Sequence, residues 1–307
     1  MEDNGMKTSL LVIALLSCAL SMNAQDRFPV TRLTSDLAQI GFASWSPDGK
    51  TIVYSLIARS DTSTKTGLWK ISPDGTDAKQ FTFALAEHPK WSPDGRWIVF
   101  DSDSGKSMKM IPAEGGAPIS FLPDSIGIFR GGMPCWSPDG TRIAFLEGVT
   151  LSLCVYDMKT RGVERIFRQG DLVPMPGCWT PDGKAILIAL MDRATRKSTL
   201  LKITSDGKER TQVQGHHEGL YRHLALSPDG SLLVYAALEG RYLGLWIMSA
   251  QGGKSIPLVV TDPGHNEAAS WSPDGKKIAF SSSRPGGGIW IMDVDVEQVK
   301  REVERVK

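Results

Sequence analysis

Apolar residues recur along the chain in six short stretches that share one register. Counted from the first residue of a recurring turn motif, the seventh position after it is always aliphatic, and the ninth is aromatic or aliphatic. These positions are Ile52, Ile98, Ile143, Ile186, Leu233 and Ile278, and then Tyr54, Phe100, Phe145, Ile188, Tyr235 and Phe280. The residue between each pair is also apolar, so both faces of each stretch need cover. The pattern predicts six strands that are buried between stacked sheets.

The turn motif is first seen as Trp45-Ser46-Pro47-Asp48-Gly49, and its near-copies begin at Trp91, Trp136, Trp179, Leu226 and Trp271. Proline presets φ in such a turn, aspartate bonds to the downstream backbone, and glycine accepts a positive φ. Successive copies begin 43 to 47 residues apart. This interval matches the four-stranded unit of a propeller blade, which has about 40–45 residues.

A third apolar stretch follows in each repeat, for example Leu68 to Ile71 and Leu245 to Met248, and a second turn comes after it, most clearly at 72–75. The predicted fold is therefore an all-β, six-bladed β-propeller of four-stranded blades. We expect one domain over residues 25–307, with blades that begin near residues 40, 86, 131, 174, 221 and 266.

The two ends of the repeat array are irregular in complementary ways. Residues 30–34 have the pattern of a strand that precedes the first repeat, and the sixth repeat runs from Met292 into Asp293 without the turn that would introduce a fourth strand. We expect the N-terminal strand to complete the last blade. This pairing closes the ring and removes an exposed sheet edge.

Four valines near the C-terminus, Val296, Val299, Val303 and Val306, recur at helical spacing among charged residues. They predict a short amphipathic helix over about 295–307. We expect this helix to cover the underside of the propeller, and recruitment of a partner is the alternative.

The first 24 residues have the pattern of a secretory signal peptide, with an apolar run from Leu10 to Leu20 and a small residue, Ala24, at the expected cleavage point. The predicted location is periplasmic or secreted, with Gln25 as the mature N-terminus. The segment that ends at Cys18 also resembles a lipoprotein cleavage site. Membrane attachment is expected only in that alternative, where Cys18 carries lipid.

Charge and cysteine content narrow the class of protein further. The 307 residues include 35 Lys and Arg against 34 Asp and Glu, a formal net charge of +1, and this balance argues against nucleic acid as the main partner. Cys135, Cys154 and Cys178 remain after cleavage, and an odd number excludes complete internal pairing. A bridge between Cys135 and Cys178 is one alternative, and buried free thiols are the expected state.

Two repeated features invite a functional interpretation that the fold makes unnecessary. The five Trp residues of the motif are potential stacking platforms, but a Trp repeated at one strand position is expected to fill the core between blades. The six motif aspartates are spread around a circle and cannot converge on one substrate atom. No Gly-x-Ser-x-Gly, Cys-x-x-Cys, His-Glu-x-x-His or dinucleotide fingerprint occurs in the sequence.

Polar residues on the inner strands supply the candidate site. Most positions three and four residues before each motif are small or apolar, so His88, Arg222, His223 and Glu267 stand out there. The candidate ligand-binding residues at the channel mouth are Glu87, His88, Arg130, His217, Arg222, His223, His265 and Glu267. Imidazoles and a carboxylate could bind a divalent metal or act as an acid–base pair. The simpler interpretation is that these polar side chains line a solvated channel. We expect His88, in the blade opposite, to lie too far from His223 to share one ion.

The repeated Trp-Ser-Pro-Asp-Gly motif, with patterns such as Lys277-Ile278-Ala279-Phe280-Ser281, resembles the six-bladed propeller of the TolB family over about residues 28–295. TolB is periplasmic, and its propeller binds other envelope proteins. It also carries an α/β domain before the propeller, for which only about a dozen residues stand here. Similar repeats occur beside the catalytic domain of prolyl-oligopeptidase-type enzymes and in oligogalacturonate lyases, which use histidines and a metal.

These observations lead to one functional hypothesis and two rivals. The resemblance implies an exported, non-enzymatic propeller, monomeric and without a cofactor, that binds an envelope protein or peptide at its channel mouth. The rival is a metal-dependent lyase or hydrolase that acts on carbohydrate through the mouth histidines. A structural subunit of a larger envelope assembly is the third possibility.

Overall fold

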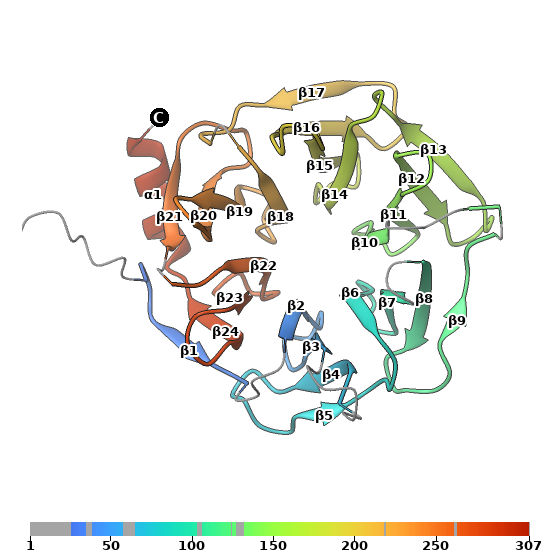
Figure 1. Ribbon diagram of the computed structural model, residues 1–307, viewed down its shortest axis with the longest axis horizontal. Helices are drawn as coiled ribbons and strands as arrows, with labels where there is room; N and C mark the ends of the chain where they lie inside the picture. The colour runs from blue at the N-terminus through green and yellow to red at the C-terminus, as the bar shows by residue number, and fades with distance from the viewer. Residues whose placement is uncertain are drawn as a thin grey trace, which may run out of the picture.

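The computed structural model describes residues 26–34, 39–57, 65–102, 106–123, 125–126, 132–217, 219–260 and 263–306, without the side chains of residues 39, 40 and 239. The described residues form six antiparallel sheets of four strands, which stand as blades around a central channel (Figure 1). The predicted six-bladed propeller is confirmed. The expected signal peptide, with Cys18 and Ala24, lies outside the described residues.

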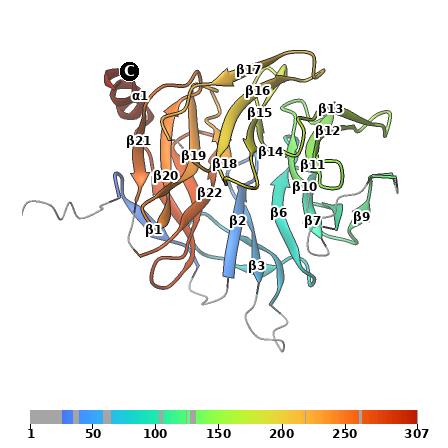
Figure 2. The same cartoon turned by 45° about the horizontal axis from the view of Figure 1, so that its top comes forward.

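In every blade the first strand of the repeat faces the channel and the last lies at the rim (Figures 1 and 2). Blade 1 contains β2 (Gln39–Trp45), β3 (Ile52–Ile57), β4 (Gly67–Ile71) and β5 (Lys79–Gln80), and blade 2 contains β6 (Ala86–Trp91), β7 (Trp97–Ser102), β8 (Ser107–Pro112) and β9 (Ile119–Ser120). Blade 3 contains β10 (Gly132–Trp136), β11 (Arg142–Glu147), β12 (Ser152–Asp157) and β13 (Val163–Phe167), and blade 4 contains β14 (Val173–Trp179), β15 (Ala185–Met191), β16 (Ser198–Thr204) and β17 (Arg210–Val213). Blade 5 contains β18 (Tyr221–Leu226), β19 (Leu232–Glu239), β20 (Tyr242–Ser249) and β21 (Ser255–Val259), and blade 6 contains β22 (Asn266–Trp271), β23 (Lys277–Ser282), β24 (Gly288–Asp293) and the N-terminal β1 (Val30–Arg32).

The ring closes as the sequence predicts, because β1 pairs with β24. The pairing is antiparallel and sets Val30 opposite Met292. It continues past the strand, where the hydroxyl of Thr34 accepts the backbone N–H of Ile289 at 3.0 Å. Asp26 adds an ion pair with Arg284 at 2.9 Å. The first and last parts of the described chain are therefore joined in one blade.

The Trp residues of the motif connect neighbouring blades. Three of them donate the indole N–H to the carbonyl that directly precedes the motif of the preceding blade: Trp136 to Lys90 at 3.2 Å, Trp179 to Cys135 at 3.1 Å and Trp271 to Ala225 at 3.3 Å. The Trp45, Trp179 and Trp271 side chains are also buried. This arrangement supports the interpretation of these residues as core between blades.

The motif turns are stabilised by their own side chains. In blade 1 the hydroxyl of Ser46 donates to Asp48 at 2.6 Å, and Asp48 also accepts the N–H of Lys50. These bonds lower the pKa of the Asp48 carboxyl, with the Ser46 bond as the largest cause. The glycine of each motif packs against the motif proline of the preceding blade, for example Gly95 against Pro47. The turns thus form a continuous second ring on one face.

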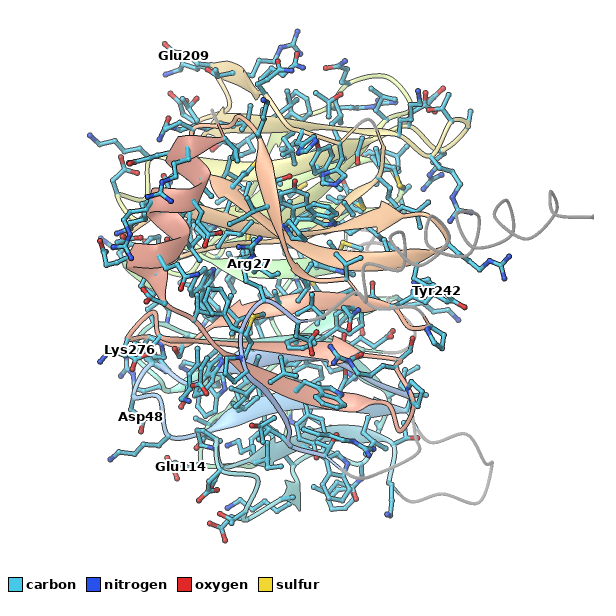
Figure 3. All side chains as sticks on the ribbon, turned by 90° about the vertical axis from the view of Figure 1, so that its left-hand side faces the viewer. Arg27, Asp48, Glu114, Glu209, Tyr242 and Lys276 are labelled. Atoms are coloured by element: carbon cyan, nitrogen blue, oxygen red, sulfur yellow. The ribbon has the colours of Figure 1, made fainter. Side chains whose placement is uncertain are left out.

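The C-terminal helix α1 (Val296–Arg305) is present as predicted and packs on the propeller itself. Val299 and Val303 are buried in a cluster with blades 5 and 6, and Lys300 forms an ion pair with Asp229 in a motif turn at 3.0 Å. Figure 3 shows α1 on the same side as the labelled turn residues Asp48 and Lys276. Across the described residues, no helix combines the length and apolarity that a membrane span requires.

Candidate functional site

All six inner strands carry a bulge at the level of the predicted site. The pairing of each first strand with the second shifts register two or three residues before the motif. In five blades the residue at the bulge has a left-handed backbone with φ between 49° and 55°: Phe42, His88, Met133, His223 and Ala268. Pro176 occupies the position in blade 4, where the ring fixes a negative φ. Left-handed non-glycine residues are strained by about 1–2 kcal/mol each, and bulges of this kind redirect a side chain.

These residues line a small cavity inside the channel. Its volume is about 50 Å³, the space of one or two water molecules at about 30 Å³ each. The side chains that give it its chemistry are Phe42, His88, Lys90, Met133, Arg222 and His223, and no acidic residue of the described chain lines it. The channel is therefore narrow and basic at this level.

His88 is held by a buried carboxylate from the neighbouring strand. Its Nδ1 lies 2.8 Å from Oδ2 of Asp101, and the same oxygen accepts the backbone N–H of Met133 in blade 3 at 3.1 Å. The Asp101 side chain is only 3 % exposed. On its other side the His88 ring packs on Phe42, with centroids 3.8 Å apart. These contacts fix the imidazole and leave Nε2 as its other polar atom.

His223 faces His88 across the channel. The two ring centroids are 6.5 Å apart, and Phe42 also contacts His223 at 5.4 Å. The expectation that these histidines lie too far apart to share one ion is therefore wrong. The two side chains come close because both residues lie at bulges of inner strands that face each other across the channel. The sequence spacing does not reveal how narrow this makes the channel.

The environment of His223 favours the neutral imidazole. Its Nδ1 lies 3.4 Å from Oε2 of Glu267, but the contact is not aligned as a hydrogen bond. Among the described residues, this nitrogen has no hydrogen-bond partner. Burial lowers the pKa of His223 well below its usual value, and the nearby charges of His88, Arg222 and Lys90 lower it further. A proton on His223 would thus add to an already positive site.

Lys90 and Arg222 supply that positive charge. Lys90 stands directly before the blade 2 motif and Arg222 directly before His223, and both are half-buried and line the cavity. Burial lowers the pKa of Lys90. Within the described part of the chain, neither side chain forms an ion pair or donates a side-chain hydrogen bond.

The structure places His217 away from the channel. Its Nδ1 lies 2.9 Å from the hydroxyl of Tyr235, and its ring packs on Trp246 with centroids 4.4 Å apart. The backbone N–H of His217 donates to the hydroxyl of Tyr221. Burial and the nearby His216 lower the pKa of His217 to about 4. His217 does not line the cavity, because its loop folds back over β19 and β20, and its part in ligand binding stays a prediction.

The other candidates are also dispersed. His265 accepts the backbone N–H of Leu243 at 3.0 Å and packs on Tyr242, so its imidazole serves the junction of blades 5 and 6 and does not line the cavity. Glu87 is half-buried on β6 and also does not line it. Arg130 lies outside the described residues.

Two features of the site escaped the sequence interpretation, although both leave a signal. Lys90 occupies the position directly before the motif, and it is the charged residue at this position. The other five repeats have Ser44, Cys135, Cys178, Ala225 and Ser270 there. Asp101 lies ten residues after the first residue of its motif, and it is the acidic residue at this position. The other five repeats have Ser55, Leu146, Ala189, Ala236 and Ser281 there. Comparison of all repeat positions, rather than only those three and four before the motif, would have found both.

The cysteines and histidines of the described chain do not assemble a metal site. No group of three or more His, Cys, Asp or Glu side chains there is arranged to hold an ion. Cys135, Cys154 and Cys178 are free thiols. Burial raises the pKa of Cys154 and of Cys178 to about 12, which makes them poor nucleophiles at neutral pH.

No family model matches the chain, but curated proteins share parts of it. An uncharacterized peptidase, YuxL of Bacillus subtilis, is 28% identical over 219 residues, which are 69% of this chain and 28% of the relative. Dipeptidyl-peptidase 5 of Porphyromonas endodontalis is 23% identical over 92% of this chain and 44% of the relative. The chain thus spans less than half the length of either. The Tol-Pal system protein TolB of Anaeromyxobacter dehalogenans is 32% identical over 43% of this chain and 29% of the relative.

Solved structures match most of the chain. TolB from Acinetobacter baumannii superposes with a TM-score of 0.59 at 18% identity and covers 85% of this chain and 65% of its own. This chain has the fold of a TolB-like six-bladed β-propeller. Oligogalacturonate lyase from Vibrio parahaemolyticus superposes as well, with a TM-score of 0.60 at 15% identity over 89% of this chain and 96% of its own. At such identities the likeness to TolB and to the lyase concerns the propeller fold alone.

Proposed function

We propose that this TolB-like propeller is an exported, non-enzymatic module that binds a protein or peptide segment at the mouth of its channel. The observation that carries the proposal is the set of bulges, which aim side chains from opposite blades at one level of the channel. Backbone strain at a shared position is typical of binding sites. His88, Arg222, His223 and Glu267 bring polar groups to this level, and the cavity of about 50 Å³ is too small to enclose a sugar ring.

The proposed partner is an envelope protein or peptide, met in the periplasm or outside the cell. Support comes from the likeness to TolB and from the predicted signal peptide. Near-neutral net charge gives the propeller no long-range preference for nucleic acid. We propose that it acts as a monomer, since β1 closes the ring and covers the edge of β24 that blade 6 would otherwise expose.

A double variant tests this proposal. His223→Ala with Glu267→Ala removes the contact that joins blades 5 and 6 at the channel. It should weaken partner capture by at least about fivefold, because interface contacts of this type contribute about 1–3 kcal/mol. Immobilised parent and variant would be exposed to the same envelope extract, and bound proteins quantified by mass spectrometry. His265→Ala, at the rim of the same blade junction, is the matched control. Equal capture by parent and double variant would exclude this site.

The alternative is a metal-dependent lyase or hydrolase that acts on carbohydrate. One support is the distance of 6.5 Å between the ring centroids of His88 and His223. The other is the fold that this chain shares with an oligogalacturonate lyase in complex with manganese, at 13% identity and a TM-score of 0.60. Elemental analysis of the purified protein decides between the two, because a stoichiometric divalent metal that is lost in His88→Ala would support the enzyme.

A further inference from the structure

The charged side chains that line the cavity are all basic. Lys90 and Arg222 line the cavity, and no Asp or Glu of the described chain does so. Two carboxylates lie near the cavity, and each of them lies beside a histidine. Asp101 is bonded to His88 and to the N–H of Met133, and Glu267 lies beside Nδ1 of His223. Half-buried cations that line one small cavity repel each other, so an anion in the cavity would stabilise the site.

We propose that the cavity binds a carboxylate group, namely the C-terminal carboxylate of an extended peptide. Arg222 would bind its two oxygens side by side, as guanidinium and carboxylate groups do, and Lys90 would supply a second charged donor. The proposal rests on the proposed function in one respect, since it names the part of the peptide partner that the channel holds.

The size of the cavity favours a carboxylate at the end of a chain. About 50 Å³ accommodates a planar group with two oxygens but not a folded segment. Towards the motif turns, the cavity continues into a wider funnel of about 320 Å³ that shares Lys90, Gly177, Leu224 and Ala269 with it. The Trp and Pro residues of the motifs line this funnel. An extended chain end can pack on these apolar residues while its terminal group reaches Lys90.

The two imidazoles provide a reporter of anion binding. The positive surroundings that lower the pKa of His223 include Arg222 and Lys90, so an anion between them must raise that pKa. The charged and titratable groups that face His223 are His88, Lys90, Arg222 and Glu267. All four are present before the anion is added, so a rise in the pKa of His223 on its addition reports binding of the anion. Binding should consequently strengthen as pH falls through the pKa of His223.

The first experiment uses sodium acetate as the probe, with sodium chloride keeping the ionic strength constant. Imidazole C–H signals of His88 and His223 are followed by NMR. We expect a saturable shift and a raised pKa of His223 in the parent. In Lys90→Met and in Arg222→Met the affinity for acetate should fall at least about tenfold, because each variant loses a charged hydrogen bond to the anion. Lys70→Met is the matched control, since Lys70 is a buried lysine stacked on Phe81 between blades 1 and 2. Equal responses to acetate and chloride, or to acetate in parent and both variants, would overturn the proposal.

The second experiment identifies the source of the carboxylate with three blocked tripeptides. Acetyl-Ala-Ala-Ala with a free C-terminus should bind more tightly than acetate. Neither the amide of the same peptide nor acetyl-Ala-Glu-Ala-amide should bind more tightly than acetate. Preference for the glutamyl peptide would overturn the terminal assignment in favour of a side chain. Binding of acetate with none of the peptides would overturn the peptide as the source. Failure of acetate, with partner capture still lost in the His223 and Glu267 double variant, would refute only this inference and leave the proposed function standing.

Discussion

The Oδ2 atom of Asp101 lies 2.8 Å from Nδ1 of His88 and 3.1 Å from the backbone nitrogen of Met133. One buried carboxylate thus fixes a channel imidazole in blade 2 and joins that blade to blade 3. Its position also depends on Gly132, where an added Cβ would lie 2.1 Å from Oδ1 of Asp101. The channel lining and the packing between these blades are therefore coupled through Asp101.

Replacement of Asp101 tests this coupling. Asp101→Ala leaves the N–H of Met133 and Nδ1 of His88 without a partner, and a buried donor left unsatisfied costs about 1–3 kcal/mol. We expect the melting temperature to fall by several degrees, at about 2–4 °C per kcal/mol for a chain of this size. Asp171→Ala, at an exposed position, is the control and should melt with the parent. A melting temperature unchanged in Asp101→Ala would show that the carboxylate contributes no stability.

Much of the fold could be predicted because repetition makes each repeat evidence for the others. One strand such as Lys277 to Ser282 is ambiguous alone, but six copies in register define both its buried faces and its spacing from the turn. The complementary defects around Val30 and Met292 predict the closure for the same reason. Both features follow from local sequence patterns and from the pairing of the N-terminal strand with the last repeat.

The site could be predicted only in part, because its geometry depends on quantities that the sequence does not display. The bulge at His223 needs a left-handed backbone at a non-glycine residue, which has no local sequence signal. The channel width depends on how side chains from opposite blades meet, so the approach of His88 to His223 was missed. The position of His217 depends in the same way on tertiary contacts, since its ring packs on Trp246 and its Nδ1 lies beside the hydroxyl of Tyr235.

The closure of the ring should be sensitive to single residues of the N-terminal segment. Thr34→Val removes the acceptor for the backbone N–H of Ile289 in a buried site, which should cost about 1–3 kcal/mol. Thr31→Val, at an exposed position of the same strand, should have little effect. Deletion of residues 27–34 removes β1 altogether and should lower the melting temperature of the whole ring in one transition. A deletion variant that melts within a degree or two of the parent would refute closure by this strand.

Stability should fall with pH between about 6.5 and 4 because of His217. Burial and His216 lower its pKa from 6.5 to about 4, so the unfolded chain binds a proton in this range more readily than the folded one. Linkage then requires that the free energy of unfolding decreases as pH falls through this window. His217→Phe keeps an aromatic ring among Tyr221, Tyr235 and Trp246 and removes the titrating group. Urea unfolding at pH 7 and pH 4.5 should show a smaller loss in the variant, and equal losses would contradict the assignment.

The contact between the turns of blades 4 and 5 should be the tightest in the ring of motif turns. Gly230 has φ +71°, and a Cβ added there would lie 2.7 Å from the ring of Pro181, whereas the equivalent atom at Gly95 would lie 3.9 Å from Pro47. Both substitutions by alanine carry the penalty of a left-handed backbone, about 1 kcal/mol. Only Gly230→Ala must also move a neighbouring blade, and forced repacking of this kind costs about a further 1–3 kcal/mol.

Thermal melts of the two alanine variants measure this difference directly. Gly170→Ala serves as a second control, because Gly170 also has a positive φ, +55°, and no atom of the described residues lies within 4 Å of the added Cβ. We expect Gly95→Ala and Gly170→Ala to lose similar stability and Gly230→Ala to lose distinctly more. If all three variants melt together, the backbone conformation alone determines the cost and the turns do not brace one another. A larger loss in Gly230→Ala would instead establish that the blades are held at the turn face by glycine packed on proline.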